Sequence, residues 1–325
     1  MTSAAFDVLG IGNAIVDVIT RADDAFLARH ELTKGSMMLI DEARAETLYA
    51  AMGPGIEVSG GSCGNTMAGV ASFGGKGAYI GKVKQDQLGA VFGHDLKSIG
   101  VSFDTPQATS GPSTARCLIM VTPDAQRTMN TYLGACTGLG PDDIDPGVVG
   151  AAQVTYVEGY LWDAPEAKKA VLKAFDAAHA AGRLVSITLS DSFCVGRYRD
   201  EFRALIRDKV DILFGNESEI TSLYEVDSFE KALEATRKEA KIAALTRSEK
   251  GSVVIKGGET YAVPAAPVSR IVDTTGAGDL YASGFLFGFT RGKPLAECAR
   301  LGGIAAAEII SHVGARPETA LKDLI

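Results

Sequence analysis

The sequence lacks the patterns that mark disulfide-bonded, zinc-binding and membrane-spanning proteins. Its five cysteines are scattered without a C-x-x-C pair, and its four histidines lie far apart, so the sequence predicts reduced thiols and no metal cluster. The chain does not open on a basic region followed by an apolar stretch, and no run approaches the roughly 20 apolar residues of a membrane span. These absences predict a cytoplasmic protein without a membrane partner.

Positive charge is also scarce, since 32 Lys and Arg residues face 40 Asp and Glu residues and the net charge is −8. This balance argues against general affinity for nucleic acid, although it does not exclude a local basic site for one nucleotide. Apolar residues make up 46% of the chain and charged residues 22%, an ordinary globular composition. A length of 325 residues predicts one large domain, or one domain with a smaller appendage.

Short apolar runs typical of buried strands alternate with stretches of helical spacing. The runs cover residues 6–12, 78–83, 154–159, 184–190, 210–215 and 242–246. One of the helical stretches, 165–182, has a single apolar stripe, Pro165 in its first turn and Gly182 as a stop. This alternation predicts an α/β fold whose mostly parallel sheet is covered by helices on both faces.

Two regions break this rhythm, at about residues 16–59 and 104–135. The second contains two strand-like segments joined around Pro123-Asp124, which is the pattern of a β-hairpin. Because apolar strand pairs that project from an α/β core need something to cover, we expect the two regions to form a small β-rich lid on a single domain of residues 1–325. The alternative is that they are ordinary surface loops.

A glycine-rich stretch, D-T-T-G-A-G-D, covers residues 273–279 and stands directly before an apolar helical run. The start of a helix exposes unpaired N–H groups, and glycine lets the backbone approach a ligand closely, so residues 274–278 are a candidate anion cradle. Asp279 at its mouth could take a proton from an attacking hydroxyl. The alternative is an aspartate that caps the helix, and this stretch alone does not decide between them.

Three other glycine clusters are candidates for nucleotide- or ligand-binding motifs. G-I-G-N (10–13) has Ile15 in place of the third glycine of a dinucleotide-binding loop, and G-G-K-G (74–77) is not followed by Ser or Thr, so neither motif is complete. S-G-G-S-C-G-N (59–65) stands before another helical run, where Asn65 could bind hydroxyl groups or simply cap that helix.

N-E-S-E (216–219) follows one of the apolar strands. Asn216 and Glu219 have the spacing of a helix capping box, which is a structural role. They also stand at the carboxyl end of a parallel strand, where α/β sites gather, and their oxygen atoms suit a hydrated Mg²⁺ ion.

Together, three of these motifs resemble the PfkB, or ribokinase-like, family of carbohydrate and nucleoside kinases. D-T-T-G-A-G-D is similar to the family's C-terminal signature, G-G-S-C-G-N to its substrate signature and N-x-x-E to its magnesium-associated motif. They occur in the family's order, and the similarity runs over nearly the whole chain. L-G-I-G-N-A-I-V-D-V (9–18) and V-D-I-L-F-G-N-E-S-E (210–219) resemble the adenosine kinases within that family. The resemblance implies a ribokinase-like fold.

The resemblance also implies a role for each matching residue. Asp279 matches the catalytic base, and Arg127 matches a lid arginine that meets phosphate, with a solvated hairpin charge as the alternative. The other matches are the anion hole, Gly276, Ala277 and Gly278; the ribose neighbours, Asn13, Asp17, Gly61 and Asn65; the base neighbours, Leu133, Ala135, Tyr160 and Phe193; the ATP-site residues, Thr246, Ser248 and Gly251; and the Mg²⁺ residues, Asn216 and Glu219, which act through water.

Three positions depart from the family pattern. Ser248 replaces a usual glycine, Thr188 stands where an asparagine near the phosphates is common, and Leu280-Tyr281 follow the aspartate where Ala-Phe is common. The first two affect the expected strength of nucleotide binding, and none removes the catalytic aspartate. Residues 295–317 read as one terminal helix, whose C-terminal part the resemblance places beside the adenine of ATP.

The resulting expectation is an ATP- and Mg²⁺-dependent kinase that phosphorylates the 5′-hydroxyl of a nucleoside, first of all adenosine. One alternative is a sugar kinase acting on ribose, fructose or a related sugar, and another is a non-catalytic binding protein on the same scaffold. The sequence leaves open whether K⁺ assists the anion hole, and whether the protein is a monomer or a homodimer joined through its lid.

Overall fold

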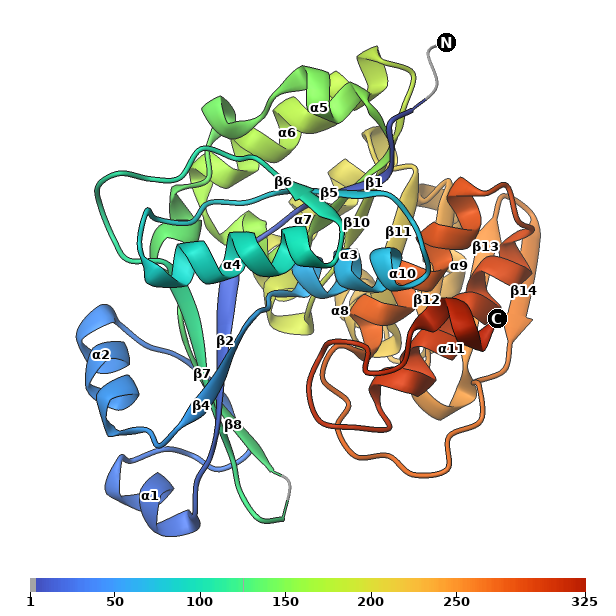
Figure 1. The fold of residues 1–325 in the computed structure, drawn as a ribbon. Helices are drawn as coiled ribbons and strands as arrows, with labels where there is room; N and C mark the ends of the chain where they lie inside the picture. Colours follow the sequence, from blue (N-terminus) through green and yellow to red (C-terminus); the bar gives the residue numbers. More distant parts are fainter. Residues whose placement is uncertain (1–3, 125) are drawn as a thin grey trace.

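The computed structural model describes residues 4–124 and 126–325, which form two β-sheets of different size (Figure 1). The larger has the strand order β14-β13-β12-β11-β10-β9-β1-β5-β6. Its strands are β1 (Phe6–Ile11), β5 (Gly77–Ile80), β6 (Val101–Phe103), β9 (Ala152–Glu158), β10 (Leu184–Thr188), β11 (Ile212–Asn216), β12 (Ile242–Thr246), β13 (Ser252–Lys256) and β14 (Glu259–Val263). All neighbours pair in parallel except β12–β13 and β13–β14, so the predicted α/β fold is confirmed.

Helices cover both faces of this sheet, because its buried strands are apolar on both sides. In β1, Val8 belongs to one core while Leu9 and Ile11 belong to the other. One layer contains α3 (Ser62–Ser72), α4 (Gln87–Ser98), α10 (Ala277–Thr290) and α11 (Leu295–Ile309); the other contains α5 (Pro146–Gly150), α6 (Pro165–Ala180), α7 (Ser192–Asp208), α8 (Glu217–Tyr224) and α9 (Phe229–Glu239).

Helix α6 shows how the sequence pattern becomes structure. The apolar stripe of the predicted helix is buried along its whole length, from Ala167 to Ala178. The helix begins at Pro165, and Gly182 follows it with a left-handed φ of 67°, as a glycine stop requires.

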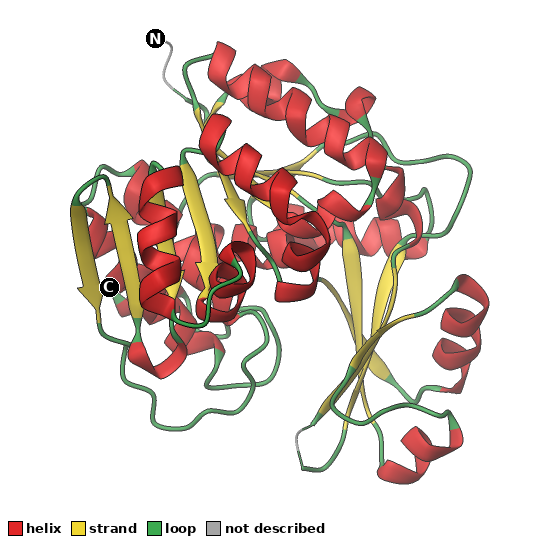
Figure 2. Ribbon diagram, turned by 180° about the vertical axis from the view of Figure 1, so that it is seen from behind, coloured by secondary structure: helices red, strands yellow, loops and turns green. Residues whose placement is uncertain are grey.

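The smaller sheet, which we call the second sheet, projects from one end of the larger one (Figures 1 and 2). Its order is β3-β8-β7-β2-β4, with β2 (Ile15–Arg21), β3 (Met37–Leu39), β4 (Gly55–Ser59), β7 (Ala115–Val121) and β8 (Arg127–Tyr132). Helices α1 (Asp24–Arg29) and α2 (Glu42–Ala51) cover one face. Antiparallel pairing of β7 with β8 confirms the hairpin around Pro123-Asp124. Residues 1–3 and 125 of the predicted domain lie outside the described residues.

Two helix boundaries differ from the predictions. Helix α3 already begins at Ser62, so Asn65 lies inside it, and the N-cap is Gly61. The predicted helix 295–317 ends at Ile309. Farther along, Gly314 takes a left-handed φ of 108° and Pro317 cannot donate a helical hydrogen bond, so the helix does not resume before Pro317. The chain after Ile309 therefore forms a loop, and this loop reaches the candidate site.

Candidate active site

A cavity of about 1370 Å³ lies between the second sheet and the carboxyl ends of the parallel strands. Polar residues at or just beyond five neighbouring strand ends line it in sheet order: Thr246, Asn216, Thr188, Glu158 and Asn13. This is where ligands bind in open parallel sheets. Every sequence-predicted site residue lines the cavity except Ala135, which is buried below its wall with its N–H donated to Ser113 O at 2.8 Å.

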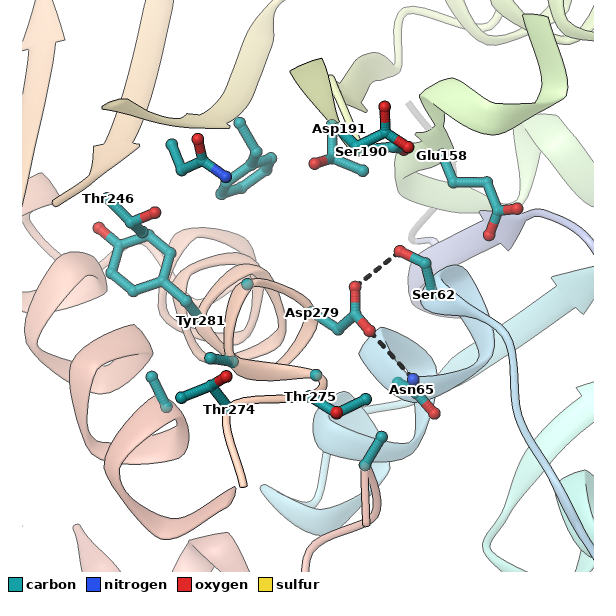
Figure 3. Close-up of a pocket in the computed structure, with 18 of the residues that line it drawn as sticks. Ser62, Asn65, Glu158, Ser190, Asp191, Thr246, Thr274, Thr275, Asp279 and Tyr281 are labelled. Atoms are coloured by element: carbon teal, nitrogen blue, oxygen red, sulfur yellow. Dashed lines mark hydrogen bonds between the residues drawn. The ribbon is translucent and has the colours of Figure 1, made fainter. Parts of the chain in front are cut away.

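Asp279 points into this cavity from the first turn of α10 (Figure 3). The capping alternative is wrong, because the N-cap is Gly276, with a left-handed φ of 79°, and Asp279 is the third residue of the helix. Its carboxylate instead accepts hydrogen bonds from Ser62 Oγ at 2.6 Å and Asn65 Nδ2 at 3.0 Å, both on α3. The sequence motif did not single out Ser62, which stands between two residues that it did.

Burial deep in the cavity raises the pKa of Asp279 to about 6, while the two hydrogen bonds and the nearby charge of Arg316 hold the pKa down. The carboxylate is therefore largely ionised near neutral pH but ready to accept a proton, which is the condition for a general base.

The loop before α10 has the form of an anion cradle. In the described residues the N–H groups of Gly276, Gly278 and Asp279 form no hydrogen bond, whereas Ala277 N donates to Thr274 O at 3.2 Å. A side chain at Gly276 is excluded, since a Cβ there would lie 2.9 Å from the Cβ of Ala315. The free N–H groups and the helix dipole favour a negatively charged group at this point.

A polar chamber surrounds Asp279. Asp17 faces it from β2, where burial raises its pKa to about 6 despite the charges of Arg316 and Arg127. Asn65 keeps its Oδ1 without a partner among the described residues. Gly61 has a left-handed φ of 79°, and a Cβ there would lie 2.4 Å from Asn13 O, so this turn needs glycine.

Glu158 belongs to the same chamber and was missed by sequence reasoning. It is 1% exposed, and its carboxylate accepts hydrogen bonds from Asn13 N, Asn13 Nδ2 and Cys63 N at 2.7–3.0 Å. Burial raises its pKa to about 7. The available signal was its position as the last residue of a buried parallel strand.

Beyond the polar chamber the cavity becomes apolar. Leu133, Tyr160 and Phe193 line it as predicted, together with Met37, Leu39, Ile119 and Met129 of the second sheet. Several of these side chains are poorly covered by protein: Phe193 is 80% exposed, Leu39 61% and Met37 51%. An apolar ligand surface would cover them.

Arg127 is not a solvated hairpin charge, so that alternative is wrong. It is 8% exposed and forms an ion pair with Asp273, the first residue of the glycine-rich stretch. Asp273 also accepts hydrogen bonds from Thr275 N and Gly314 N. The second sheet is thereby tied to the loop that carries the anion cradle.

The other end of the cavity contains the residues matched to ATP and Mg²⁺. Asn216 and Glu219 form the expected capping box, and burial raises the pKa of Glu219 to about 7. Ser248 keeps a left-handed φ of 51°, so a serine here adopts the conformation that the usual glycine takes readily. Gly251 has a φ of 82°, and a Cβ there would lie 2.1 Å from Val263 O.

Comparison with known proteins gives a consistent result. A sequence profile described as pfkB family carbohydrate kinase matches residues 53–321. The structure is similar to that of an adenosine kinase from Sinorhizobium meliloti and to that of a probable sugar kinase from Rhizobium etli CFN 42; each match has a TM-score of 0.91 and 54% identity and covers 99% of this chain and 98% of the other. Adenosine kinase from Saccharomyces cerevisiae is 27% identical over 94% of both chains.

Proposed function

Because the chain belongs to the pfkB family of carbohydrate kinases and is thus a phosphotransferase with an alcohol acceptor, we propose that it transfers the γ-phosphoryl group of ATP to the 5′-hydroxyl of a nucleoside, first of all adenosine. One observation carries the choice of acceptor. The cavity joins a polar chamber around Asp279 to an apolar chamber whose side chains the protein leaves uncovered.

The two chambers suit the two halves of a nucleoside. Asp17, Asn65 and the Asn13–Glu158 pair offer hydrogen-bonding groups for ribose hydroxyls. A purine is flat and largely apolar on its faces, and burying about 100 Å² of apolar surface contributes roughly 2.5 kcal/mol. A free sugar would leave Phe193 and Leu39 exposed. The similarity to an adenosine kinase over nearly the whole chain supports the same choice.

Asp279 accepts the proton of the acceptor hydroxyl in this reaction. Ser62 and Asn65 hold the carboxylate in place, so the base needs little reorganisation before proton transfer. The free N–H groups at residues 276, 278 and 279 stabilise the charge that develops on the transferring group. The second sheet acts as a lid that excludes water, which would otherwise compete as acceptor.

Mg²⁺ fits the Asn216–Glu219 end of the cavity as a hydrated ion. Each oxygen of Glu219 accepts one hydrogen bond from Asn216 and keeps a further lone pair for water. In the described residues no group of three acidic, histidine or cysteine side chains forms a protein cage, and Mg²⁺ commonly binds through one or two carboxylates, water and substrate phosphates. When bound, the ion supplies charge neutralisation to the phosphates.

A sugar kinase is the second candidate, and Glu158 favours it. The buried carboxylate of Glu158 in the polar chamber could bind additional sugar hydroxyls, and one close structural relative is a probable sugar kinase. Family membership argues against the non-catalytic alternative.

The test is ADP release with ATP, Mg²⁺ and a panel of adenosine, guanosine, inosine, cytidine, ribose and fructose, in K⁺ and in Na⁺ buffer. Turnover should be highest with adenosine and should fall about 100-fold or more in Asp279→Asn, the scale of general-base loss. Tyr160→Ala should raise KM for the nucleoside more than KM for ATP. Activity with sugars alone would overturn the choice of acceptor, and near-wild-type kcat in Asp279→Asn would overturn the choice of base.

The structure contains no helix, within the residues it describes, that is long and apolar enough to cross a membrane. A cytoplasmic location, a monomeric or lid-joined dimeric state and a contribution from K⁺ stay predictions.

A further inference from the structure

Arg316 occupies an unusual position in the loop that follows α11. Its guanidinium group turns inward and donates from Nε and Nη2 to Ser59 O, from Nη2 to Ser59 Oγ at 3.0 Å and from Nη1 to Gly64 O at 2.6 Å. Ser59 ends strand β4, and Gly64 lies in the first turn of α3. One side chain therefore bridges the two ends of the turn that contains Gly61 and Ser62.

The same loop also contacts the opposite wall of the site. Gly314 N donates to Asp273 at 3.0 Å, and Ala315 packs against Gly276 of the anion cradle. Residues 314–316 thus connect the anion cradle to the turn that presents Ser62 and Asn65 to Asp279. The position of Ser62 and Asn65 relative to Asp279 therefore depends on this connection.

Arg316 forms no direct ion pair with any residue that the structure describes, so no carboxylate in contact with it neutralises its charge. Its hydrogen bonds all go to neutral oxygens, so its field acts on the groups around it. The groups facing it come from four elements: Asp17 on β2, Tyr79 on β5, Asp95 on α4 and Asp279 on α10. Asp95 itself is engaged, because it accepts the N–H of Ser59 at 2.7 Å.

We propose that Arg316 is a positioning residue for phosphoryl transfer, which fixes the turn 59–64 against the anion cradle and whose unpaired positive charge favours the ionised carboxylates of Asp17 and Asp279. Its field lowers the pKa of both carboxyl groups, opposing the effect of burial. Arg316 does not line the cavity, so it acts through Ser62, Asn65 and the carboxylates rather than by touching substrate. The proposal rests on the function of Asp279 proposed above.

The test compares Arg316→Gln, which keeps a polar side chain without charge, with Arg316→Lys, which keeps the charge but loses most of the hydrogen bonds. The readout is the pH dependence of kcat/KM for adenosine, with KM for ATP measured in parallel. In Arg316→Gln the acid limb should move up by about half a pH unit or more, because removing a nearby positive charge raises carboxyl pKa values. In Arg316→Lys the acid limb should stay near the wild-type value while KM for adenosine rises.

Arg199→Gln is the control, since Arg199 is also half-buried and donates to a backbone carbonyl, Ser222 O, but contacts neither the turn 59–64 nor the anion cradle and pairs with Glu225 at 3.2 Å. It should change neither the acid limb nor KM. An unshifted acid limb in Arg316→Gln, or a Lys variant no closer to wild type than the Gln variant, would refute the proposal. If Arg316→Gln does not fold, Arg316→Lys decides alone: a shifted acid limb in that variant refutes the charge role.

Asp279→Asn separates this proposal from the proposed function. If Asp279→Asn keeps its turnover, the base assignment fails and the inference about Arg316 fails with it. If Asp279→Asn is inactive while the Arg316 variants titrate like the wild type, only the inference about Arg316 is wrong.

Discussion

Replacing Ser62 by alanine removes one of the two hydrogen bonds to the carboxylate of Asp279 and leaves the other in place. Burial raises the pKa of Asp279 to about 6, and the Ser62 hydroxyl opposes that effect. A hydrogen bond to a charged group is worth about 1.5–3 kcal/mol, and one pKa unit corresponds to about 1.4 kcal/mol. Since water in the cavity recovers part of the loss, we expect the pKa of Asp279 to rise by about one unit.

The sign and size of the effect follow directly. In the proposed reaction Asp279 must be ionised, so activity should fall as the pH falls through its pKa. Raising that pKa from about 6 to about 7 lowers the ionised fraction about fivefold near pH 6 and by less than about 10% near pH 8. Ser62→Ala should therefore be markedly slower than wild type in mild acid, whereas the two should converge in mild base apart from a constant positioning loss.

The assay is kcat/KM for adenosine across that pH range, followed through ADP release. Ser62→Thr keeps the hydroxyl and should keep the wild-type acid limb. Ser72→Ala removes a hydroxyl at the other end of α3, where it accepts the N–H of Leu321, and should leave the profile unchanged. An acid limb in Ser62→Ala that coincides with wild type would show that this hydrogen bond does not tune the base.

Three further predictions concern other parts of the site. Burial raises the pKa of Glu158 to about 7, so below that pH the folded protein binds a proton that the unfolded chain has released. This group alone should therefore stabilise the folded protein by about 2 kcal/mol when the pH falls from about 8 to about 5.5. Glu158→Gln should abolish this gain in Tm measurements. At Ser248, with φ of 51°, Ser248→Val should cost about 1–2 kcal/mol in denaturant unfolding and Ser248→Gly nothing; equal effects would contradict the strain argument. Arg127→Gln and Asp273→Asn should be coupled by about 1 kcal/mol or more in a double-mutant cycle on the free energy of unfolding, and additive effects would show that the buried ion pair contributes nothing.

Much of the fold could be predicted because the relevant patterns are local. Buried parallel strands are continuous apolar runs, and the stripe of α6 with its Pro165 and Gly182 boundaries needs no tertiary information. The end of α11 could not be read in the same way. Apolar residues continue at helical spacing past Ile309, at Ile310 and Val313, and the contacts that favour a loop there, such as that of Gly314 with Asp273, come from distant parts of the chain.

Parts of the candidate site could likewise be predicted from local sequence, and other parts could not. The glycine-rich stretch by itself left Asp279 between a helix cap and a base, and resemblance to a kinase family favoured the base. The structure removes the capping role, because Asp279 lies in the third position of α10 and accepts its hydrogen bonds from α3. For Ala135 the structure does not support the sequence match, since this residue is buried and does not line the cavity.

The sequence by itself determined the α/β fold, the order of its motifs and the identity of the carboxylate at the helix start, because those features depend on side-chain periodicity and on short runs of residues. Only the tertiary structure decided that Ser62 holds this carboxylate, that Glu158 lines the polar chamber, that Arg127 is buried against Asp273 and that Arg316 spans the turn 59–64. The physical reason is distance along the chain. These contacts join residues that are 95 to 257 positions apart, and a sequence pattern carries no information on which distant groups share a low-dielectric cavity.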